Sequence, residues 1–238
     1  MARSVSCTIM AYNEEATLAE ATTDVVDALA AFGDREFEVI IVDDGSTDRT
    51  PEIARALAAR YPQVRVVTHE RNRGPGSALL TGFAESRHEL VCFHPADQQL
   101  PFAEVAALLP LLDEHDLVIC SRTSRPGYTV MRQLSSRVYI ALVHLLFGLR
   151  DFDDFNFVYL YRKELLDRIR IETRGVFMPT ELMIKAVAAG AKVAPAIVTC
   201  LPRRAGVASC GRPAVIAETF WQMVRFFARW RLRPRARR

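Results

Sequence analysis

Long apolar runs, glycine and proline are all scarce in this sequence. No stretch approaches the roughly 18–20 uninterrupted apolar residues that a membrane-spanning helix needs. Glycine (11) and proline (12) are too few among 238 residues for a low-complexity linker protein. Half of the residues are hydrophobic and 25% are charged, which excludes intrinsic disorder, a collagen-like repeat or a coiled coil for the whole chain. The composition predicts a globular protein with a sizeable core.

Paired cysteines and a leader segment are also missing from the pattern. None of the five cysteines belongs to a Cys-x-x-Cys pair, and four stand in apolar surroundings typical of strands. They are Cys7, Cys92, Cys120, Cys200 and Cys210. The apolar stretch near the N-terminus ends at Asn13-Glu14-Glu15, which makes it too short and too acidic for a signal peptide. We therefore expect reduced thiols in a cytoplasmic protein.

Positive charge gathers at the C-terminal end of the chain. The whole sequence has 31 basic and 28 acidic residues, a net charge of +3. From Arg212 onward there are eight arginines and one acidic residue, Glu218, so the part before Arg212 carries 23 bases against 27 acids. A basic tail on a mildly acidic body indicates an anionic partner, either a lipid surface or a nucleic acid. Because no recognisable nucleic-acid-binding module surrounds the tail, we favour the lipid surface.

Short buried apolar runs alternate with stretches of helical periodicity in the first half. We expect strands at 4–10, 37–42, 64–68, 90–93 and 116–120, and helices at 17–32, 50–60, 74–86 and 102–112. This alternation predicts a Rossmann-like α/β fold, a mainly parallel sheet with helices on both faces. Later in the chain we expect helices at 131–149, 163–169 and 180–189, and strands at 155–161 and 192–200.

Polar residues follow four of the expected strands. They are Tyr12–Glu15 after the first strand, Asp43 and Asp44 after the second, Asp97 after the fourth, and Ser121 and Arg122 after the fifth. In a parallel sheet, ligands bind beyond the carboxyl ends of the strands. Helix capping explains one such loop equally well, but four loops opening on the same edge favour a binding site.

The chain shows neither internal repeats nor a linker, so we expect one domain at 1–211. We expect its first half, 1–122, to bind a nucleotide and its second half, 123–211, to bind an acceptor, followed by a basic amphipathic tail at 212–238. In the tail, the stretch 215–232 has helical periodicity, with an apolar face of Ile216, Phe220, Met223, Phe227 and Trp230. This face either packs on the core or lies in a membrane interface, attaching the protein peripherally to the inner face of the membrane. The stretch 138–149 is a second candidate for lipid contact, or simply core.

Motifs that match one enzyme family occur in order along nearly the whole chain. They are Tyr12-Asn13-Glu14-Glu15, Val42-Asp43-Asp44-Gly45-Ser46, Asn72-Arg73-Gly74, Ala96-Asp97-Gln98-Gln99, Ser121-Arg122, Arg132 with Ser136, Asp153, Glu181 and Arg203. Each is weak alone, but the ordered set resembles the family 2 glycosyltransferases. The resemblance is strongest to the branch that makes polyprenyl-phosphate sugars, the dolichyl-phosphate mannose or glucose synthases.

The resemblance implies a GT-A-type fold and an inverting hexosyltransferase. The donor is a GDP- or UDP-linked sugar, and the acceptor is a polyprenyl phosphate, as in cell-envelope synthesis. Nucleotide binding is implied for Tyr12, Asn13, Glu14, Asp43, Asp44 and Ala96, and acceptor binding for Ser136, Asp153 and Glu181. Catalytic roles are implied for Asp97, Arg122, Arg132 and Arg203, since arginine binds phosphate oxygens bidentately. An acceptor phosphate is ionised at pH 7 and needs little help from a base.

The resemblance also implies a divalent cation, Mg²⁺ or Mn²⁺, on the donor diphosphate. Its ligands are implied to be Asp97 and Gln99, but Pro95 stands where the family has a further carboxylate. Mg²⁺ often takes only one or two protein carboxylates, so this loss weakens the site without abolishing it. His94 is an alternative ligand, or it merely ends a strand. In the acceptor half, Ser209 replaces an expected basic residue.

Three alternatives stay open at this point. The same fold could glycosylate another lipid or a cell-envelope glycan. The departures at Pro95 and Ser209 could mark a degenerate paralogue that binds nucleotides without turnover. For Asp153 and Glu181, a structural hydrogen bond is at least as good an interpretation as acceptor binding.

Overall fold

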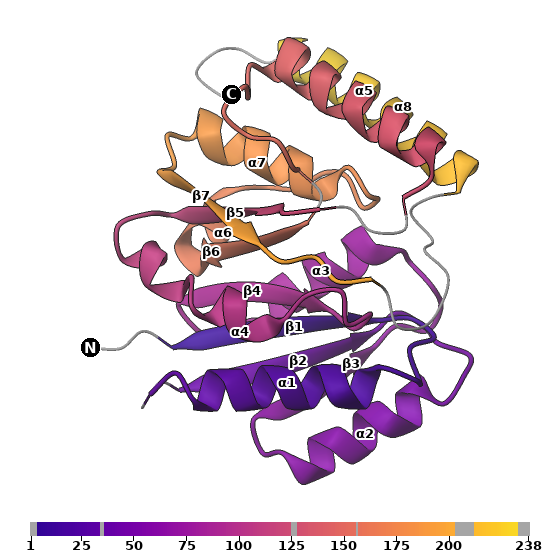
Figure 1. Ribbon diagram of the computed structural model, residues 1–238, viewed down its shortest axis with the longest axis vertical. Helices are drawn as coiled ribbons and strands as arrows, with labels where there is room; N and C mark the ends of the chain where they lie inside the picture. Colours follow the sequence, from indigo (N-terminus) through magenta and orange to yellow (C-terminus); the bar gives the residue numbers. More distant parts are fainter. Residues whose placement is uncertain (1–3, 34–35, 125–127, 156, 203–211, 233–238) are drawn as a thin grey trace.

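The computed structural model describes residues 4–33, 36–124, 128–155, 157–202 and 212–232 (Figure 1). Three residues singled out from the sequence, Arg203, Ser209 and Cys210, lie outside the described residues. The other four cysteines are buried and free, as expected for reduced thiols packed as apolar side chains.

A seven-stranded sheet forms the centre of the molecule. Its strands are β1 (Val5–Ala11), β2 (Phe37–Asp43), β3 (Val64–Thr68), β4 (Leu90–Pro95), β5 (Leu117–Arg122), β6 (Val158–Arg162) and β7 (Val193–Val198). Their order across the sheet is β3-β2-β1-β4-β6-β5-β7. The pairs β1–β2, β1–β4, β2–β3 and β5–β7 are parallel, which confirms the mainly parallel sheet.

Strand β6 is the exception, and it decides how the two halves of the sheet are joined. It lies between β4 and β5 and pairs antiparallel with both. Because β6 reverses the direction twice, β5 and β7 run the same way as β1 and β4. The carboxyl ends of β1, β2, β4, β5 and β7 therefore meet at one edge of the sheet, although β6 had no sequence signal for its position.

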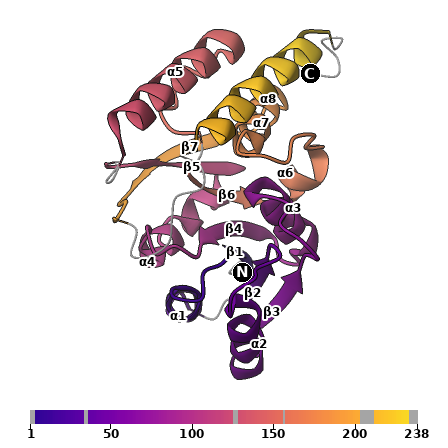
Figure 2. The same ribbon diagram turned by 90° about the vertical axis from the view of Figure 1, so that its right-hand side faces the viewer.

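Helices cover both faces of the sheet. They are α1 (Leu18–Ala30), α2 (Thr50–Arg60), α3 (Pro75–Glu85), α4 (Phe102–Ala106), α5 (Val130–Phe147), α6 (Lys163–Arg168), α7 (Met178–Ala188) and α8 (Pro213–Leu232). In Figure 2, α1 and α4 lie on one side of the sheet and α3 and α6 on the other. Helix α3 approaches β1 closely because Gly82 has no side chain; a Cβ there would lie 2.2 Å from the Thr8 side chain.

The prediction of one helix over 102–112 is wrong in its second half. Helix α4 ends at Ala106, and a separate 3₁₀ helix covers Leu109–Asp113. Pro110 explains the break, because its ring clashes with the carbonyl four residues earlier and it has no N–H to continue the helix. All other expected helices and strands are present among the described residues within a few residues of the predicted bounds.

Helices α5 and α8 lie side by side as the outermost layer of the molecule (Figures 1 and 2). Phe147 of α5 contacts Phe226 and Phe227 of α8, with ring centroids 5.8 and 5.6 Å apart. Met223 and Phe226 are buried in the main core, and Trp230 packs against it. The apolar face predicted for α8 therefore packs on the protein, which favours the first of the two interpretations of this helix. Within the described part of the chain, no helix is long and apolar enough to span a bilayer.

Candidate functional site

Two loops at the carboxyl edge of the sheet are joined to each other by side-chain hydrogen bonds. Asn13, which follows β1, accepts a hydrogen bond from the Thr47 N–H at 2.9 Å, and the Glu14 N–H donates to Thr50 Oγ1 at 2.8 Å. Asn13 has a positive φ of 54°, a conformation that asparagine tolerates better than most residues. Tyr12 stands beside this junction with 44% of its surface exposed. The structure thus brings together the residues predicted after β1 and β2.

Asp44 organises a third loop through its carboxylate. Its Oδ1 accepts hydrogen bonds from the Arg73 N–H at 2.9 Å and from His69 Nδ1 at 2.6 Å, while its Oδ2 accepts from the Gly74 N–H at 2.8 Å. His69 is itself buried and reaches Thr81 Oγ1 through Nε2 at 2.9 Å. Asp44 therefore uses both oxygens to fix the loop that starts α3. His69 had no motif to mark it.

Asp43, the residue before Asp44, has one carboxylate oxygen without a hydrogen-bond partner among the described residues. Its side chain is fully buried, and Oδ1 accepts a hydrogen bond from the Ser46 N–H at 3.0 Å. Oδ2 has no hydrogen-bond partner among the described residues. A buried carboxylate oxygen without a donor is costly, which indicates that a ligand or water supplies one.

The loop after β4 brings the Asp97 segment to the same edge. The Ala96 N–H donates to the Met10 carbonyl of β1, and Asp97 is only 6% exposed. Gln98 has a positive φ of 57°, and its buried Nε2 has no partner in the described structure. Gln99 links this loop to the segment after β7, because its backbone carbonyl accepts from the Leu201 N–H at 2.8 Å and its side-chain Nε2 donates to the Leu201 carbonyl at 3.3 Å. Residues from β1, β4 and β7 thus meet here.

The oxygen donors at Asp97 fit a divalent cation only when a ligand supplies the remaining oxygens. Asp97 Oδ1 already accepts a 3.3 Å hydrogen bond from the Gln99 N–H. Among the described residues, no group of three or more His, Cys, Asp or Glu side chains is arranged to hold a metal. One carboxylate and one amide oxygen match a cation such as Mg²⁺, which commonly keeps waters and takes phosphate oxygens from a substrate.

His94 lies within the core of the sheet. It is in register with Ile9 of β1, it is 1% exposed, and its ring packs edge-on against Phe102 at 5.3 Å. Burial lowers its pKa to about 4, so the imidazole is neutral at pH 7. Both ring nitrogens are without a hydrogen-bond partner among the described side chains and backbone groups. This placement favours the interpretation in which His94 ends a strand over a role as a metal ligand.

Arg122, at the end of β5, is held by Asp154. Arg122 Nε and Nη2 donate to the two Asp154 carboxylate oxygens at 2.7 and 2.9 Å. Burial opposes the charge on Arg122, but the hydrogen bonds with Asp154 outweigh it and raise the arginine pKa. Sequence reasoning chose Asp153, which is exposed, and missed Asp154, which is buried. No periodicity in this loop distinguishes two adjacent aspartates.

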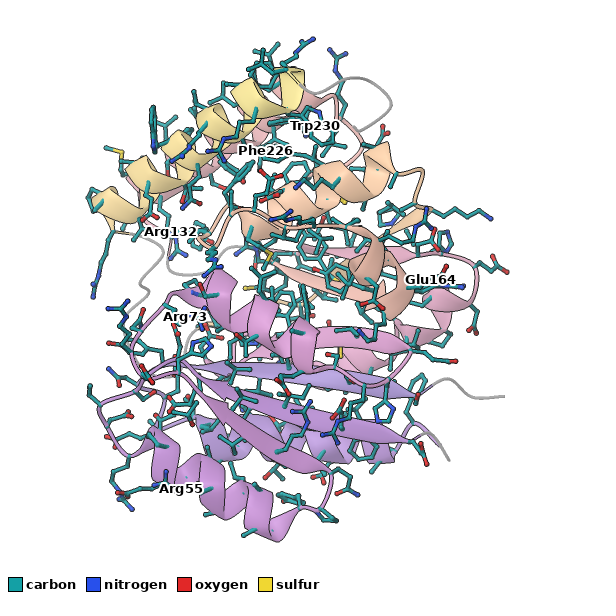
Figure 3. All side chains as sticks on the ribbon, turned by 180° about the vertical axis from the view of Figure 1, so that it is seen from behind. Arg55, Arg73, Arg132, Glu164, Phe226 and Trp230 are labelled. Atoms are coloured by element: carbon teal, nitrogen blue, oxygen red, sulfur yellow. The ribbon has the colours of Figure 1, made fainter. Side chains whose placement is uncertain are left out.

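Tyr128 connects Arg122 to Arg132, the second predicted arginine. Its hydroxyl accepts a 2.8 Å hydrogen bond from Arg122 Nη1, and the Arg132 guanidinium lies over its ring at 3.8 Å. Arg132 is in the first turn of α5, where Thr129 caps the helix by accepting from the Arg132 N–H. In Figure 3, Arg132 lies on the same side of the molecule as Arg73 of the loop that Asp44 holds. The first turn of α5 thus presents one cation and the positive end of the helix dipole there.

The remaining predicted acceptor residues differ in their surroundings. Ser136 is half-buried one turn after Arg132 on α5. Glu181, on α7, is fully buried and accepts hydrogen bonds from the Glu172 and Thr173 N–H groups and from Lys185 Nζ. Because both of its oxygens are used inside the protein, the structural interpretation of Glu181 is favoured.

Comparison with known proteins identifies the family of this chain. The family model described as "Glycosyl transferase family 2" matches residues 6–175. A curated relative from Pseudomonas paraeruginosa, undecaprenyl-phosphate 4-deoxy-4-formamido-L-arabinose transferase, is 34% identical over 178 residues, which cover 74% of this chain and 52% of the relative. The dolichol-phosphate mannosyltransferase of Pyrococcus furiosus is 30% identical over 188 residues, 76% of this chain and 52% of that protein. The chain spans about half the length of the curated relatives it matches.

Among solved structures, the fold is similar to that of glucosyl-3-phosphoglycerate synthase from Mycobacterium tuberculosis, solved with Mn²⁺, uridine diphosphate and glucosyl-3-phosphoglycerate. The TM-score is 0.71 and the identity 23%, with 94% of this chain and 79% of that chain covered. The same synthase was also solved with Mg²⁺ and uridine diphosphate. At this identity the likeness establishes the GT-A-type fold alone.

Proposed function

The chain belongs to glycosyl transferase family 2, and from that premise we propose that it moves a hexose, with inversion, from a nucleotide-diphosphate sugar to a polyprenyl phosphate. One observation carries the proposal: carboxylates and an arginine from separate loops lie at one edge of a single sheet. Asp43 and Asp97 stand at the ends of β2 and β4, and Arg122 stands at the end of β5. The names of the curated relatives, which act on undecaprenyl and dolichol phosphates, support this choice of acceptor.

On the donor side, the loops after β1 and β2 bind the nucleoside. Asp43 Oδ2 is the buried acceptor that lacks a donor, which a base or ribose group supplies. Tyr12, Asn13 and Glu14 border it, and Asp44 acts by fixing the loop at Gly74. A comparison of GDP- and UDP-sugars as donors distinguishes guanine from uracil as the base.

The diphosphate lies next to Asp97 in this proposal. Asp97 and Gln99 would hold a Mg²⁺ or Mn²⁺ ion, which when bound neutralises the charge that develops on the leaving nucleotide. The ionised acceptor phosphate attacks the anomeric carbon directly, so the chain needs no general base at that point. Arg122 and Arg132 orient the phosphate and screen its charge from the diphosphate.

A membrane surface is the second partner in the proposal. It meets the outward side of α5, which includes part of the expected stretch 138–149, and the outward side of α8 rather than the apolar face of α8. The outward side of α5 exposes apolar side chains at helical spacing: Met131, Leu134, Val138 and Leu145. The outward side of α8 exposes Trp221 and Val224 beside Arg225, which is also exposed. We call these side chains the outer stripe. Exposed apolar and aromatic groups next to arginine fit a bilayer containing anionic lipids.

The transfer reaction is tested with a panel of labelled GDP- and UDP-sugars and a short polyprenyl phosphate. We expect label to enter the organic phase as an acid-labile product that survives mild base. Asp97→Asn should lower turnover at least about a hundredfold, because cation-assisted charge stabilisation supplies several kcal/mol. Product on a glycan or a neutral lipid would instead favour another acceptor. Tight nucleotide binding with no turnover on any donor would favour a non-catalytic paralogue.

Membrane attachment is tested by flotation with vesicles of neutral and of anionic lipid. Leu134→Glu with Trp221→Glu places two carboxylates in the outer stripe and should abolish flotation with anionic vesicles. Val187→Glu, an exposed apolar residue on α7, is the matched control and should float as the unmodified protein does. Undiminished flotation of the double variant would remove the outer stripe from the proposal.

A further inference from the structure

One aromatic side chain connects both arginines of the acceptor side. Tyr128 lies just before the first turn of α5, and its hydroxyl oxygen accepts a hydrogen bond from Arg122 Nη1 at 2.8 Å. Its ring lies 3.8 Å from the Arg132 guanidinium carbon and 5.6 Å from that of Arg122. No motif in the sequence marked this tyrosine. Its two functional parts, hydroxyl and ring, serve different arginines.

Arg122 is fixed on several sides. Asp154 accepts hydrogen bonds from Nε and Nη2 in a bidentate pair, and the Tyr128 hydroxyl accepts one from Nη1. The Phe157 ring lies 4.8 Å from the guanidinium carbon. A guanidinium has five N–H donors. Three are used, so two on Nη1 and Nη2 have no partner among the described residues. The orientation of this free end is set before any ligand arrives.

Arg132 depends on the tyrosine ring in a different way. It is half-buried and has no ion pair among the described residues, so stacking on Tyr128 is its main contact. A cation over an aromatic face is held there by the ring quadrupole. Asp154 cancels one of the two arginine charges, so Arg122, Arg132 and Asp154 together have a net charge of about +1. Because so little net charge is left to attract a phosphate, the orientation of the two guanidinium groups matters more for holding it.

We propose that Tyr128 and Asp154 are positioning residues that preset Arg122 and Arg132 as a two-guanidinium clamp for a phosphate group. The inference rests on the proposed function, in which that phosphate belongs to the polyprenyl acceptor. Neither residue touches the reacting atoms. Tyr128 sets the distance between the two guanidinium groups, and Asp154 sets the direction of the free end of Arg122. A preset clamp avoids the entropy cost of ordering two long side chains when the ligand binds.

The chain offers variants that separate the two parts of Tyr128. Tyr128→Phe removes only the hydroxyl that holds Arg122, whereas Tyr128→Leu also removes the ring under Arg132. Tyr61→Leu is the matched control, because Tyr61 also stacks with an arginine, Arg60, at 4.9 Å, but directly after α2 and away from the carboxyl edge of the sheet. Farnesyl phosphate in detergent micelles is the acceptor probe, and the nucleoside diphosphate of the accepted donor is the donor probe.

Binding of each probe is measured by calorimetric titration, and KM for each substrate is measured alongside. We expect Tyr128→Leu to weaken farnesyl phosphate binding about tenfold or more and Tyr128→Phe about threefold, as loss of a stacked cation and of one hydrogen bond predict. The KM for farnesyl phosphate should rise in the same order. Nucleotide binding and the donor KM should stay within about twofold, which a general loss of structure would not allow.

Asp154→Asn distinguishes positioning from simple neutralisation. If Asp154 only cancelled the charge of Arg122, its removal would strengthen phosphate binding. Under the proposal it weakens binding, because Arg122 loses its bidentate partner. The Tyr128 variants decide the matter if Asp154→Asn does not fold.

Two kinds of result would overturn the inference, and they differ from each other. Unchanged farnesyl phosphate binding in Tyr128→Leu, or an equal loss of nucleotide binding, would contradict the proposed clamp but would not contradict the proposed sugar transfer. An unmodified protein that neither binds farnesyl phosphate nor transfers sugar to it would end the proposed function and the clamp together.

Discussion

A buried carboxylate holds a loop in each half of this molecule, and the two differ in what neutralises them. In the N-terminal half, Asp44 accepts from the Arg73 and Gly74 N–H groups and from His69. In the C-terminal half, Glu181 accepts from the N–H groups of residues 172 and 173, from the Thr173 hydroxyl and from Lys185. The loop held by Glu181 meets the start of α3, since a Cβ added to Gly76 would lie 2.4 Å from the Arg174 carbonyl oxygen.

The comparison shows two ways to fix a loop at the same sheet edge. The partners of Asp44 are two backbone N–H groups and an imidazole, none of which carries a permanent charge. Glu181 is paired with Lys185, which is 7% exposed and also contacts Glu172 at 3.1 Å. Removing Glu181 leaves a buried ammonium with a weaker partner. The C-terminal half should therefore be the more sensitive to loss of its carboxylate.

The largest effect is expected for Glu181→Gln. Breaking a buried ion pair from one side should lower the free energy of unfolding by about 3–5 kcal/mol. Urea unfolding measures this loss. The double variant Glu181→Gln with Lys185→Met removes both charges and should recover a large part of it. Equal stability of the single and double variants would show that Lys185 is not the reason for the sensitivity.

A smaller effect is expected for Asp44→Asn. Two backbone N–H groups lose their charged acceptor, which should cost about 2–3 kcal/mol. Donor nucleotide affinity should fall as well, because the loop at Gly74 is no longer fixed, and titration with GDP or UDP measures this. Asp116→Asn is the matched control: Asp116 accepts from the Lys192 N–H at 2.8 Å, at the opposite edge of the sheet. A cost for Asp44→Asn above that of Glu181→Gln would reverse the comparison.

The smallest effect is expected from His94, on β4, through the pH dependence of the free energy of unfolding. Burial lowers the pKa of His94 to about 4, against about 6.5 in an unfolded chain. Below pH 6.5 the unfolded chain therefore binds a proton that the folded protein does not, so stability falls with decreasing pH and the fall levels off near pH 4. Between pH 7 and 5 this histidine should lower the free energy of unfolding by about 1.5–2 kcal/mol.

Urea unfolding of the unmodified protein and of His94→Gln at both pH values measures this contribution. The difference between pH 7 and 5 should shrink by that amount in His94→Gln and stay unchanged in His88→Gln, a half-exposed control. An undiminished pH dependence in His94→Gln would mean that the imidazole is not protonated on unfolding.

Several features of the site could be read from residues alone. Asp43, Asp97 and Arg122 follow buried strands, and strands of one direction must end at one edge. Others could not. Asp153 and Asp154 are adjacent residues of the same type, so the sequence does not tell them apart. Only the path of the chain after α5 turns Asp154 inward to Arg122. Tyr128 belongs to the site because the first turn of α5 brings it between two arginines.

By itself, the sequence determined the alternation of strands and helices, the family motifs and the apolar character of α8, since periodicity and turn residues are local properties of a chain. Tertiary structure alone decided that β6 enters the sheet antiparallel, that the strong apolar face of α8 packs on the core, and that its weaker face is exposed. The physical reason is that burial and hydrogen-bond pairing depend on which distant segments meet. An amphipathic helix has the same pattern whether its apolar face meets protein or lipid.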